Sequence, residues 1–294
     1  MHHKKKFEKG FGEHRILLIG ASGMLGRAFV KELSERNTHF IPGLRPDFDL
    51  LKDRCFELIE KLRPQLILNC AAYTDVNGAE AHEQLAFAVN AYAVRRLAEL
   101  ARRIGAFLVN FGTDYVFDGR SQAPYRVDAP IAPGNAYARS KALGERWLLR
   151  SGCEALQVRT SWLYAPWGKN FVRTIATRAM EGARLRVVND QRGRPTSAEH
   201  LARTTLALIE RNAQGIFHVC DGGECTWFEL AQAVVRGLGL EGHVRVEPCT
   251  SAEWPSPARR PAYSVLDLSE TEALLGPMPH WTTNLAHVLS RLEA

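Results

Sequence analysis

The chain has 294 residues, of which 46% are hydrophobic and 24% charged, and its formal net charge is +6. This composition is typical of a soluble globular protein with one large core or two unequal lobes. No run of about 18 apolar residues occurs, so we expect no transmembrane helix. The charge beyond the basic tail Met1–Lys6 is too evenly spread for a nucleic-acid-binding surface. We expect a cytoplasmic protein with a disordered tail, and neither nucleic acid nor membrane as its partner.

The cysteines carry little information about function. There are six, at positions 55, 70, 153, 220, 225 and 249, and they form no C-x-x-C pair. Cys70 and Cys220 lie within apolar runs. We therefore expect reduced, buried thiols and not disulfides or metal ligands. The N-terminal charges are not followed by the apolar segment of a signal peptide.

The first motif combines a strand, a glycine-rich turn and a helix. The apolar run Arg15–Ile19 predicts a buried strand, and the turn Gly20–Gly26 follows it directly. A helical pattern then places Leu25, Ala28, Phe29 and Leu33 on one face. Such a turn lets backbone N–H groups approach a pyrophosphate at the helix N-terminus. The spacing is G-x-x-G-x-x-G and not G-x-G-x-x-G, and a turn without a ligand is the alternative.

The second strand indicates which dinucleotide is bound. We expect it at His39–Leu44, although Pro42 is a poor strand residue. In sheets of this kind, an acidic residue at the end of this strand binds the ribose 2′-OH of NAD. Arg45 stands there instead and, with Arg27 on the first helix, favours the 2′-phosphate of NADPH, with NADH as the alternative. A solvent-facing Arg45 would carry no such meaning.

Strand and helix patterns then alternate. A third strand, Gln65–Tyr73, ends in small residues, which let a ligand approach the sheet edge. The apolar spacing over Ala79–Ile104 predicts one long helix, with Leu85 on its apolar side. Further strands are expected at Ala106–Phe111, Glu154–Leu163 and Gly215–Val219. This alternation predicts a parallel, doubly wound sheet.

Beyond Leu163 the regular alternation of strand and helix patterns ends. Asn170–Gly182 is helical, and Val187–Pro195 is a strand that breaks into a polar, basic loop. Three capping boxes predict helix starts: Thr196 with Glu199, Thr226 with Glu229, and Ser269 with Glu272. We expect a smaller lobe that closes over the sheet edge, with some segments returning to the first lobe.

The chemistry centres on a tyrosine and a lysine. Tyr137 and Lys141 are one turn apart on a helix that follows a proline-rich loop, so they share a face. A nearby ammonium favours the phenolate and lowers the pKa of the tyrosine. Such a tyrosine can give a proton to a carbonyl oxygen as hydride reaches the carbon. Thr113, expected just after a strand, could hold that carbonyl. The alternative is a tyrosine and a lysine on a solvated helix face.

These motifs resemble those of a known enzyme group. The glycine turn, Asn69–Thr74, Asn90-Ala91, Thr113–Gly119 and Tyr137-x-x-x-Lys141 resemble extended short-chain dehydrogenase/reductases. The later motifs resemble the dTDP-4-dehydrorhamnose reductase family: Arg159–Tyr164, Gly168–Phe171, Asn189–Thr196 and Arg260–Asp267. The likeness runs from about Arg15 to the C-terminus. The chain departs from the family pattern at Gly112, at Asn77-Gly78 and at Val127.

The resemblance implies an α/β fold: a Rossmann-type doubly wound parallel sheet with a smaller C-terminal substrate-binding lobe. The NAD(P)-binding domain would span residues 14–165, with 197–221 returning to it, and the substrate lobe 166–294. It assigns the catalytic roles to Thr113, Tyr137 and Lys141. Cofactor contacts fall on Gly20, Ser22, Gly23, Met24, Leu25, Arg45, Asp49, Leu50, Ala71, Ala72, Tyr73, Asn90, Tyr137 and Lys141. Substrate contacts fall on Thr113, Asp114, Trp162, Asn170, Gln191 and Arg260.

The implied reaction is reduction by NADPH of the C4 ketone of dTDP-4-dehydro-L-rhamnose. The substrate diphosphate would meet basic residues of the second lobe, unless these are only solvated: Arg192, Arg194, Arg259 and Arg260. We expect no metal, and the resemblance allows a homodimer. Two alternatives stay open. One is a reductase of another nucleotide-linked 4-ketohexulose, and the other is an NADP-binding subunit similar to the regulatory subunit of methionine adenosyltransferase.

Overall fold

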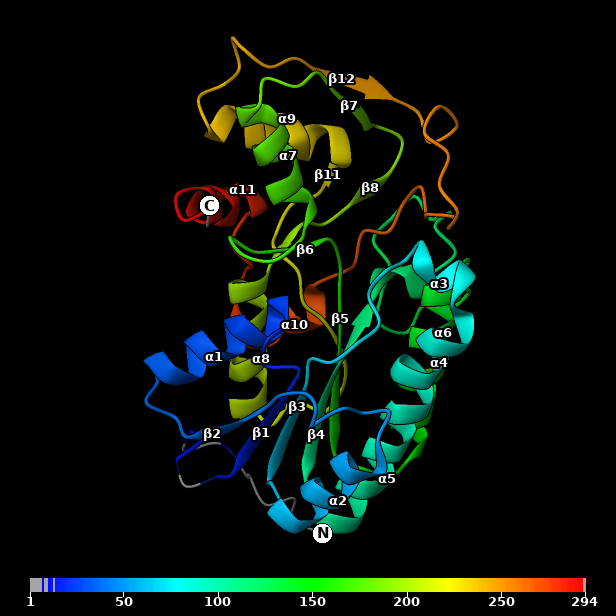
Figure 1. Ribbon diagram of the computed structural model, residues 1–294, viewed down its shortest axis with the longest axis vertical. Helices are drawn as coiled ribbons and strands as arrows, with labels where there is room; N and C mark the ends of the chain where they lie inside the picture. The colour runs from blue at the N-terminus through cyan, green and yellow to red at the C-terminus, as the bar shows by residue number, and fades with distance from the viewer. Residues whose placement is uncertain (1–6, 8–9, 13, 293–294) are drawn as a thin grey trace.

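The structure is a computed structural model that describes residues 7, 10–12 and 14–292. The expected disordered tail, Met1–Lys6, lies outside the described residues. At the centre is a six-stranded sheet in the order β10-β5-β4-β3-β1-β2, and all its pairings are parallel (Figure 1). Its strands are β1 (Ile16–Ile19), β2 (Phe40–Gly43), β3 (Leu66–Asn69), β4 (Phe107–Thr113), β5 (Ala155–Thr160) and β10 (Gly215–His218). The predicted fold class is confirmed.

Helices cover both faces of this sheet, which explains why its strands are continuous apolar runs. Ile16 and Leu18 pack with α1 (Met24–Glu35) and α8 (Ala198–Glu210). Leu17 and Ile19 point to the other face, which is covered by three helices. These are α2 (Asp53–Leu62), α5 (Ala93–Ile104) and α6 (Ala136–Arg150).

The long helix expected over Ala79–Ile104 is wrong in one respect. The chain there forms α3 (Gly78–Ala81), α4 (Glu83–Phe87), a π-helical turn (Ala88–Tyr92) and then α5. The π turn lies against α6, where a Cβ on Gly144 would stand 2.0 Å from the carbonyl oxygen of Asn90. Leu85 is 43% exposed and does not join the core. Packing against α6 therefore overrides the local helical periodicity.

A smaller group of elements stands at one end of the sheet (Figure 1). Its apolar core includes Val172, Leu185, Leu230 and Val288. Its strands are β6 (Leu163–Tyr164), β7 (Leu185–Val188), β8 (Arg192–Gly193), β9 (Thr196–Ser197), β11 (Cys225–Thr226) and β12 (Val246–Cys249). Its helices are α7 (Phe171–Met180), α9 (Trp227–Gly237) and α11 (Trp281–Leu289). Helix α10 (Ser269–Leu275) packs instead against α8 and β10.

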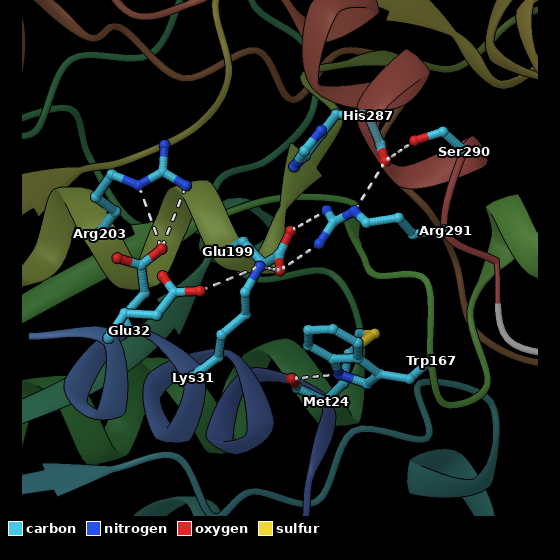
Figure 2. A network of polar contacts seen from close by, with 10 residues as sticks. Met24, Lys31, Glu32, Trp167, Glu199, Arg203, His287, Ser290 and Arg291 are labelled. Atoms are coloured by element: carbon cyan, nitrogen blue, oxygen red, sulfur yellow. Dashed lines mark hydrogen bonds and ion pairs between the residues drawn. The ribbon is translucent and has the colours of Figure 1, made fainter.

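An ion-pair cluster joins these two parts of the molecule (Figure 2). Glu199 of α8 is buried and binds Lys31 of α1 at 2.6 Å. The same carboxylate binds the guanidinium of Arg291, just after α11. Helix α1, which follows the glycine turn, is thereby tied to the C-terminal helix.

One of the three predicted capping boxes is confirmed. Thr226 and Glu229 exchange side-chain-to-backbone hydrogen bonds at the start of α9. The other two are wrong. Thr196 pairs in β9 with β6, so α8 begins one residue later, and Glu199 is engaged in the ion pairs. In α10 the capping position is Leu268, and the N–H of Ser269 donates to Asp267.

The expectation of reduced thiols is confirmed, since all six cysteines are free. Cys70 and Cys153 are only partly buried, whereas the other four are buried. Within the described ranges, no helix is long and apolar enough to cross a membrane.

Candidate active site

A cleft of about 340 Å³ opens at the carboxyl ends of β1, β2 and β3. It lies where the strand order reverses, because β1 has β2 on one side and β3 on the other. Open α/β sheets bind ligands at such a switch point. Nine of the predicted cofactor residues line the cleft: Gly20, Ser22, Gly23, Arg45, Asp49, Leu50, Ala71, Ala72 and Tyr73.

The glycine turn needs its glycines for close backbone approach. Gly20 has a φ of +77°, and a Cβ there would stand 2.8 Å from the amide nitrogen of Ala71. A Cβ on Gly26 would stand 2.1 Å from the carbonyl oxygen of Gly20. The turn therefore presses against both β3 and its own helix, with the N-terminus of α1 beside the cleft. This end of a helix favours a phosphate.

Met24 and Leu25 were predicted to contact the cofactor but do not line the cleft. Leu25 is buried in the core, and the carbonyl of Met24 accepts a hydrogen bond from the indole of Trp167 at 3.0 Å (Figure 2). The guanidinium of Arg27 lies 4.7 Å from the centre of that indole ring. Sequence reasoning missed Trp167, because a tryptophan between a proline and a glycine gave no periodic signal.

Arg45 lies on the cleft wall as an exposed residue. In the described part of the chain it has no carboxylate partner within ion-pair distance, so its charge is available to a ligand. The same wall also includes residues that the sequence did not assign to a cofactor: Gly43, Phe48, Leu51, Cys70, Leu85 and Val89. The first four lie at or after the ends of β2 and β3, so the strand assignments could have found them, whereas Leu85 and Val89 come from α4 and the π turn.

Helix α6 starts at the other side of the site. Asn135 caps it by accepting from the N–H of Ala138 at 2.8 Å, and the N–H of Ala136 donates to Glu80 at 2.7 Å. Asn135 also donates to the carbonyl of Arg259 at 2.9 Å. The start of the helix that carries Tyr137 is thereby fixed by α3 and by a C-terminal loop.

Tyr137 and Thr113 meet beside the cleft. Tyr137 packs on the same group of alanines as Tyr73, which lines the cleft. The side-chain hydroxyl of Thr113, at the end of β4, acts to lower the pKa of Tyr137. Burial is the larger effect and raises that pKa above its ordinary value.

Lys141 lies one turn along α6 but does not act as the sequence predicted. Its ammonium is buried and donates to the carbonyl of Phe111 at 2.6 Å. Burial lowers the pKa of Lys141 to about 8, while the carboxylate of Glu145 raises it. The expected lowering of the pKa of Tyr137 by Lys141 is therefore wrong, because desolvation of the buried phenol dominates and raises that pKa.

Asn90 is fully engaged with protein groups. Its side chain accepts from the N–H of Tyr73 at 2.9 Å and donates to the carbonyl of Tyr73 at 3.0 Å. It also donates to Ser140 at 3.0 Å, whose hydroxyl donates to the carbonyl of Tyr137 at 2.7 Å. Asn90 thus connects the cofactor cleft to the tyrosine. The sequence missed Ser140, which only the helix packing reveals.

The predicted substrate residues lie in different places. Trp162 stacks on Trp227, with ring centroids 3.6 Å apart and planes 7° apart, and has a φ of 47°. A bulky residue in this left-handed region is strained, and such strain is common at functional sites. Asn170 caps α7, and Gln191 donates to Ser251 at 2.8 Å. These two side chains therefore serve the local fold.

The arginines predicted to contact the substrate diphosphate differ in their hydrogen-bond and ion-pair partners. Arg194 donates to the carbonyls of Leu266 and Gly223, and Arg192 lies within 4 Å of Glu224 and Glu229. Arg260 instead donates to neutral groups, the Asn77 side chain at 3.1 Å and the Ser256 hydroxyl. Neither Arg259 nor Arg260 has a carboxylate partner among the described residues.

No group of three or more potential ligands for a metal occurs among the residues that the structure describes. The expectation of no metal stays a prediction.

Residues 14–294 match the family described as "RmlD substrate binding domain". The chain belongs to the dTDP-4-dehydrorhamnose reductase family. It is therefore an NAD(P)-dependent oxidoreductase of the extended short-chain dehydrogenase/reductase type.

Members of this family with different names are similar to the chain. A dTDP-4-keto-6-deoxy-D-glucose reductase from Streptomyces niveus is 39% identical, over 95% of this chain and 98% of the relative. A dTDP-4-dehydrorhamnose reductase from Mycobacterium tuberculosis is 37% identical, over 94% of this chain and 92% of the relative. The crystal structure of dTDP-4-dehydrorhamnose reductase from Bacillus anthracis in complex with NADP has a TM-score of 0.90 and 33% sequence identity. The match covers 94% of this chain and 99% of that one.

Proposed function

We propose that this chain uses NADPH to reduce the C4 ketone of dTDP-4-dehydro-L-rhamnose, giving dTDP-L-rhamnose. The observation that carries the proposal is the position of Tyr137 beside the glycine-rich cleft, on the same alanine cluster as the cleft residue Tyr73 and near enough to Thr113 for that hydroxyl to lower its pKa. A phenol and a hydroxyl at that place can donate to and orient a ketone oxygen. The relative from Mycobacterium tuberculosis bears the name of this activity.

The site residues divide the work as follows. Tyr137 donates the proton to the C4 oxygen, and Thr113 holds that oxygen before transfer. Lys141 would hold the nicotinamide ribose and supply a positive charge near the phenol. Bound NADPH supplies the hydride. The turn Gly20–Gly26 binds its diphosphate.

NADPH is favoured over NADH by the position of Arg45. A guanidinium on the cleft wall after β2 is a partner for the 2′-phosphate, because it binds phosphate through charge-assisted hydrogen bonds. The relative from Bacillus anthracis was crystallised with NADP, in agreement with this preference.

Trp162 is proposed as the surface on which the sugar packs. Asp114 and Arg260 are proposed as further contacts of the sugar. The strained backbone of Trp162 and its stack on Trp227 hold the indole in one orientation. A fixed apolar face of this kind suits a deoxysugar ring. The roles of Asn170 and Gln191 in substrate binding are indirect in this proposal.

The test is a comparison of Tyr137→Phe with Tyr92→Phe, an exposed tyrosine outside the site. NADPH oxidation is followed with dTDP-4-dehydro-L-rhamnose. We expect Tyr137→Phe to lose about 10²- to 10⁴-fold in kcat while keeping its affinity for NADPH. Tyr92→Phe should match the wild type. Unchanged turnover by Tyr137→Phe would refute the assignment of the proton donor.

A second candidate is favoured by the name of the relative from Streptomyces niveus, which acts on a different dTDP-linked ketosugar. The wild-type protein should therefore also be given dTDP-4-keto-6-deoxy-D-glucose, and the C4 configuration of each product read by NMR. A larger kcat/KM for dTDP-4-keto-6-deoxy-D-glucose than for dTDP-4-dehydro-L-rhamnose would make the glucose derivative the proposed substrate. No turnover of either compound would reject both candidates.

A further inference from the structure

Trp167 belongs to the loop between β6 and α7, yet it packs in the core beneath the six-stranded sheet. With Ala165 it joins the apolar cluster that contains Leu25 and Phe29 of α1. Tyr164, one residue before Ala165, belongs to the separate apolar core of the smaller group of elements. The chain therefore passes from one core to the other between Tyr164 and Trp167, and Trp167 is the end that reaches α1.

The indole of Trp167 makes one directed contact with the glycine turn. Its N–H donates to the carbonyl of Met24, the first residue of α1, at 3.0 Å (Figure 2). The trans peptide plane that holds this carbonyl also holds the N–H of Leu25, and the two groups point in opposite directions. The indole therefore fixes the direction of the Leu25 N–H, which points towards the N-terminal end of α1.

The N–H of Leu25 is placed to bind an anion. An α-helix leaves its first four N–H groups without an intrahelical acceptor, and Leu25 is the second residue of α1. Gly23 lines the cleft at the N-cap and makes no side-chain hydrogen bond to these groups. The side chain of Leu25 is buried in the core, so its backbone N–H is the part that a diphosphate at the turn can reach.

Contacts with α7 fix the loop that carries Trp167. The amide of Asn170, which caps this helix, donates to the carbonyls of Ala165 at 2.9 Å and Trp167 at 3.2 Å. Gly168 has a φ of +69°, a conformation that favours glycine and turns the chain after the tryptophan. The guanidinium of Arg27 lies over the indole, 4.7 Å from its centre. Together these contacts hold the indole in one orientation against the turn.

A second contact holds α1 about two turns further along. Lys31 binds Glu199, which also binds Arg291 (Figure 2). The axis of α1 is therefore fixed without Trp167, and loss of the indole N–H alone should leave the helix in place. The indole adds a local effect, the orientation of the first peptide of the helix.

We propose that Trp167 is a positioning residue for the NADPH diphosphate, and that it directs the Leu25 N–H at the phosphate oxygens. This role rests on the proposed binding of the diphosphate at the turn Gly20–Gly26. The loop between β6 and α7 thus completes a cofactor site whose other residues come from the first strands of the sheet. The two parts of the molecule must be docked for the diphosphate to bind at full strength.

The test compares the dissociation constants of NADPH and of adenosine 2′-phosphate, measured by calorimetry for the wild type, Trp167→Phe and Trp254→Phe. Phenylalanine keeps an aromatic ring beside Arg27 but has no N–H to donate. Adenosine 2′-phosphate carries the phosphate that Arg45 is proposed to bind but lacks the diphosphate. Trp254 is 56% exposed and lies outside the glycine turn, so its variant is the control.

We expect Trp167→Phe to raise the dissociation constant of NADPH about 3- to 10-fold, the effect of one hydrogen bond. The dissociation constant of adenosine 2′-phosphate should stay unchanged. Trp254→Phe should match the wild type with both ligands. An unchanged dissociation constant of NADPH in Trp167→Phe would overturn the proposal. So would equal weakening of both ligands, because a tryptophan with a purely structural role would loosen the whole cleft when it is replaced.

A second measurement uses the wild type alone. Hydrogen exchange of the Leu25 N–H, followed by NMR with isotope-labelled leucine, should be slowed by NADPH and not by adenosine 2′-phosphate. Unchanged exchange in the presence of NADPH would overturn the proposal even if Trp167→Phe does not fold. Neither measurement involves turnover. A protein that gives the expected binding results but reduces no dTDP-ketosugar would therefore fail the proposed function and keep this role for Trp167.

Discussion

Glu145 and Arg159 form an ion pair in which both side chains are 1% exposed, between the sheet and the helix that carries Tyr137. Two guanidinium nitrogens donate to the carboxylate at 2.6 and 3.0 Å. Glu145 lies two turns after Tyr137 on the same face of α6 and one turn after Lys141. A line of amides continues from this pair across the sheet: Gln157, Asn110 and Asn69. The pair therefore fixes the register of α6, the helix that carries Tyr137, on strands β3 to β5.

We predict that Glu145→Gln destabilises the protein by about 3–5 kcal/mol, because Arg159 is left as a buried, unpaired charge. Urea unfolding measures the loss. The control is Glu60→Gln, which breaks the exposed pair with Arg103 and should change stability by less than about 1 kcal/mol. Equal losses of stability for the two substitutions would show that the buried pair contributes no more to stability than the exposed pair.

Gly144 provides a second test of how α6 is held. Alanine is the better helix former by about 1 kcal/mol, so Gly144→Ala should stabilise an isolated helix. Here the new Cβ would stand 2.0 Å from the carbonyl oxygen of Asn90 and push α6 away from the π turn. We expect lower thermal stability and a reduced kcat, measured with NADPH saturating.

The matched control is Gly134→Ala, where the nearest atom to a new Cβ is 4.0 Å away. Its melting temperature and kcat should stay close to those of the wild type. If Gly144→Ala melts at the same temperature as this control, the close approach of the two helices is not a constraint on the site.

Most of the sheet could be predicted from the sequence, because a parallel strand buried on both faces is a continuous apolar run. Ile16–Ile19 and Leu66–Asn69 show this clearly. The tyrosine and the lysine could be placed on one helix face from their spacing alone. The glycine turn was informative because its strand and helix neighbours could be recognised.

The rest depends on tertiary contacts that leave no periodic signal. The π turn exists because Asn90 bonds Tyr73 and packs on Gly144. Lys141 turns to the carbonyl of Phe111 only once β4 lies beneath α6. Trp167 reaches the glycine turn from the other part of the molecule, 143 positions along the chain from Met24.

Glu199 should govern stability in acid (Figure 2). Hydrogen bonds from Arg291 and Lys31 outweigh the effect of burial and lower the pKa of Glu199 from 4.5 to about 2. A carboxyl whose pKa is lower in the folded state adds stability above its unfolded pKa and loses it as pH falls to the folded value. The contribution is therefore complete above pH 4.5 and fades between 4.5 and about 2.

The measurement is the melting temperature of the wild type and of Glu199→Gln over that pH window. The wild type should be more stable at pH 6, and the difference between the two proteins should shrink as pH falls. Glu35→Gln, at an exposed carboxylate that also faces Lys31, is the control and should show a small and even difference. A gap between wild type and Glu199→Gln that is constant with pH would contradict the role of Glu199.

Arg45 should decide the choice between the two nicotinamide cofactors. Its guanidinium is exposed on the cleft wall and has no carboxylate partner among the described residues, so it can bind a 2′-phosphate without breaking an existing pair. We expect Arg45→Gln to raise the KM for NADPH by about 10- to 100-fold, the loss of one or two charge-assisted hydrogen bonds, and to leave the KM for NADH nearly unchanged. Arg54→Gln, an exposed arginine already paired with Asp47, is the control and should alter neither value. Equal increases in both KM values for Arg45→Gln would mean that Arg45 stabilises the cleft wall and does not bind the 2′-phosphate.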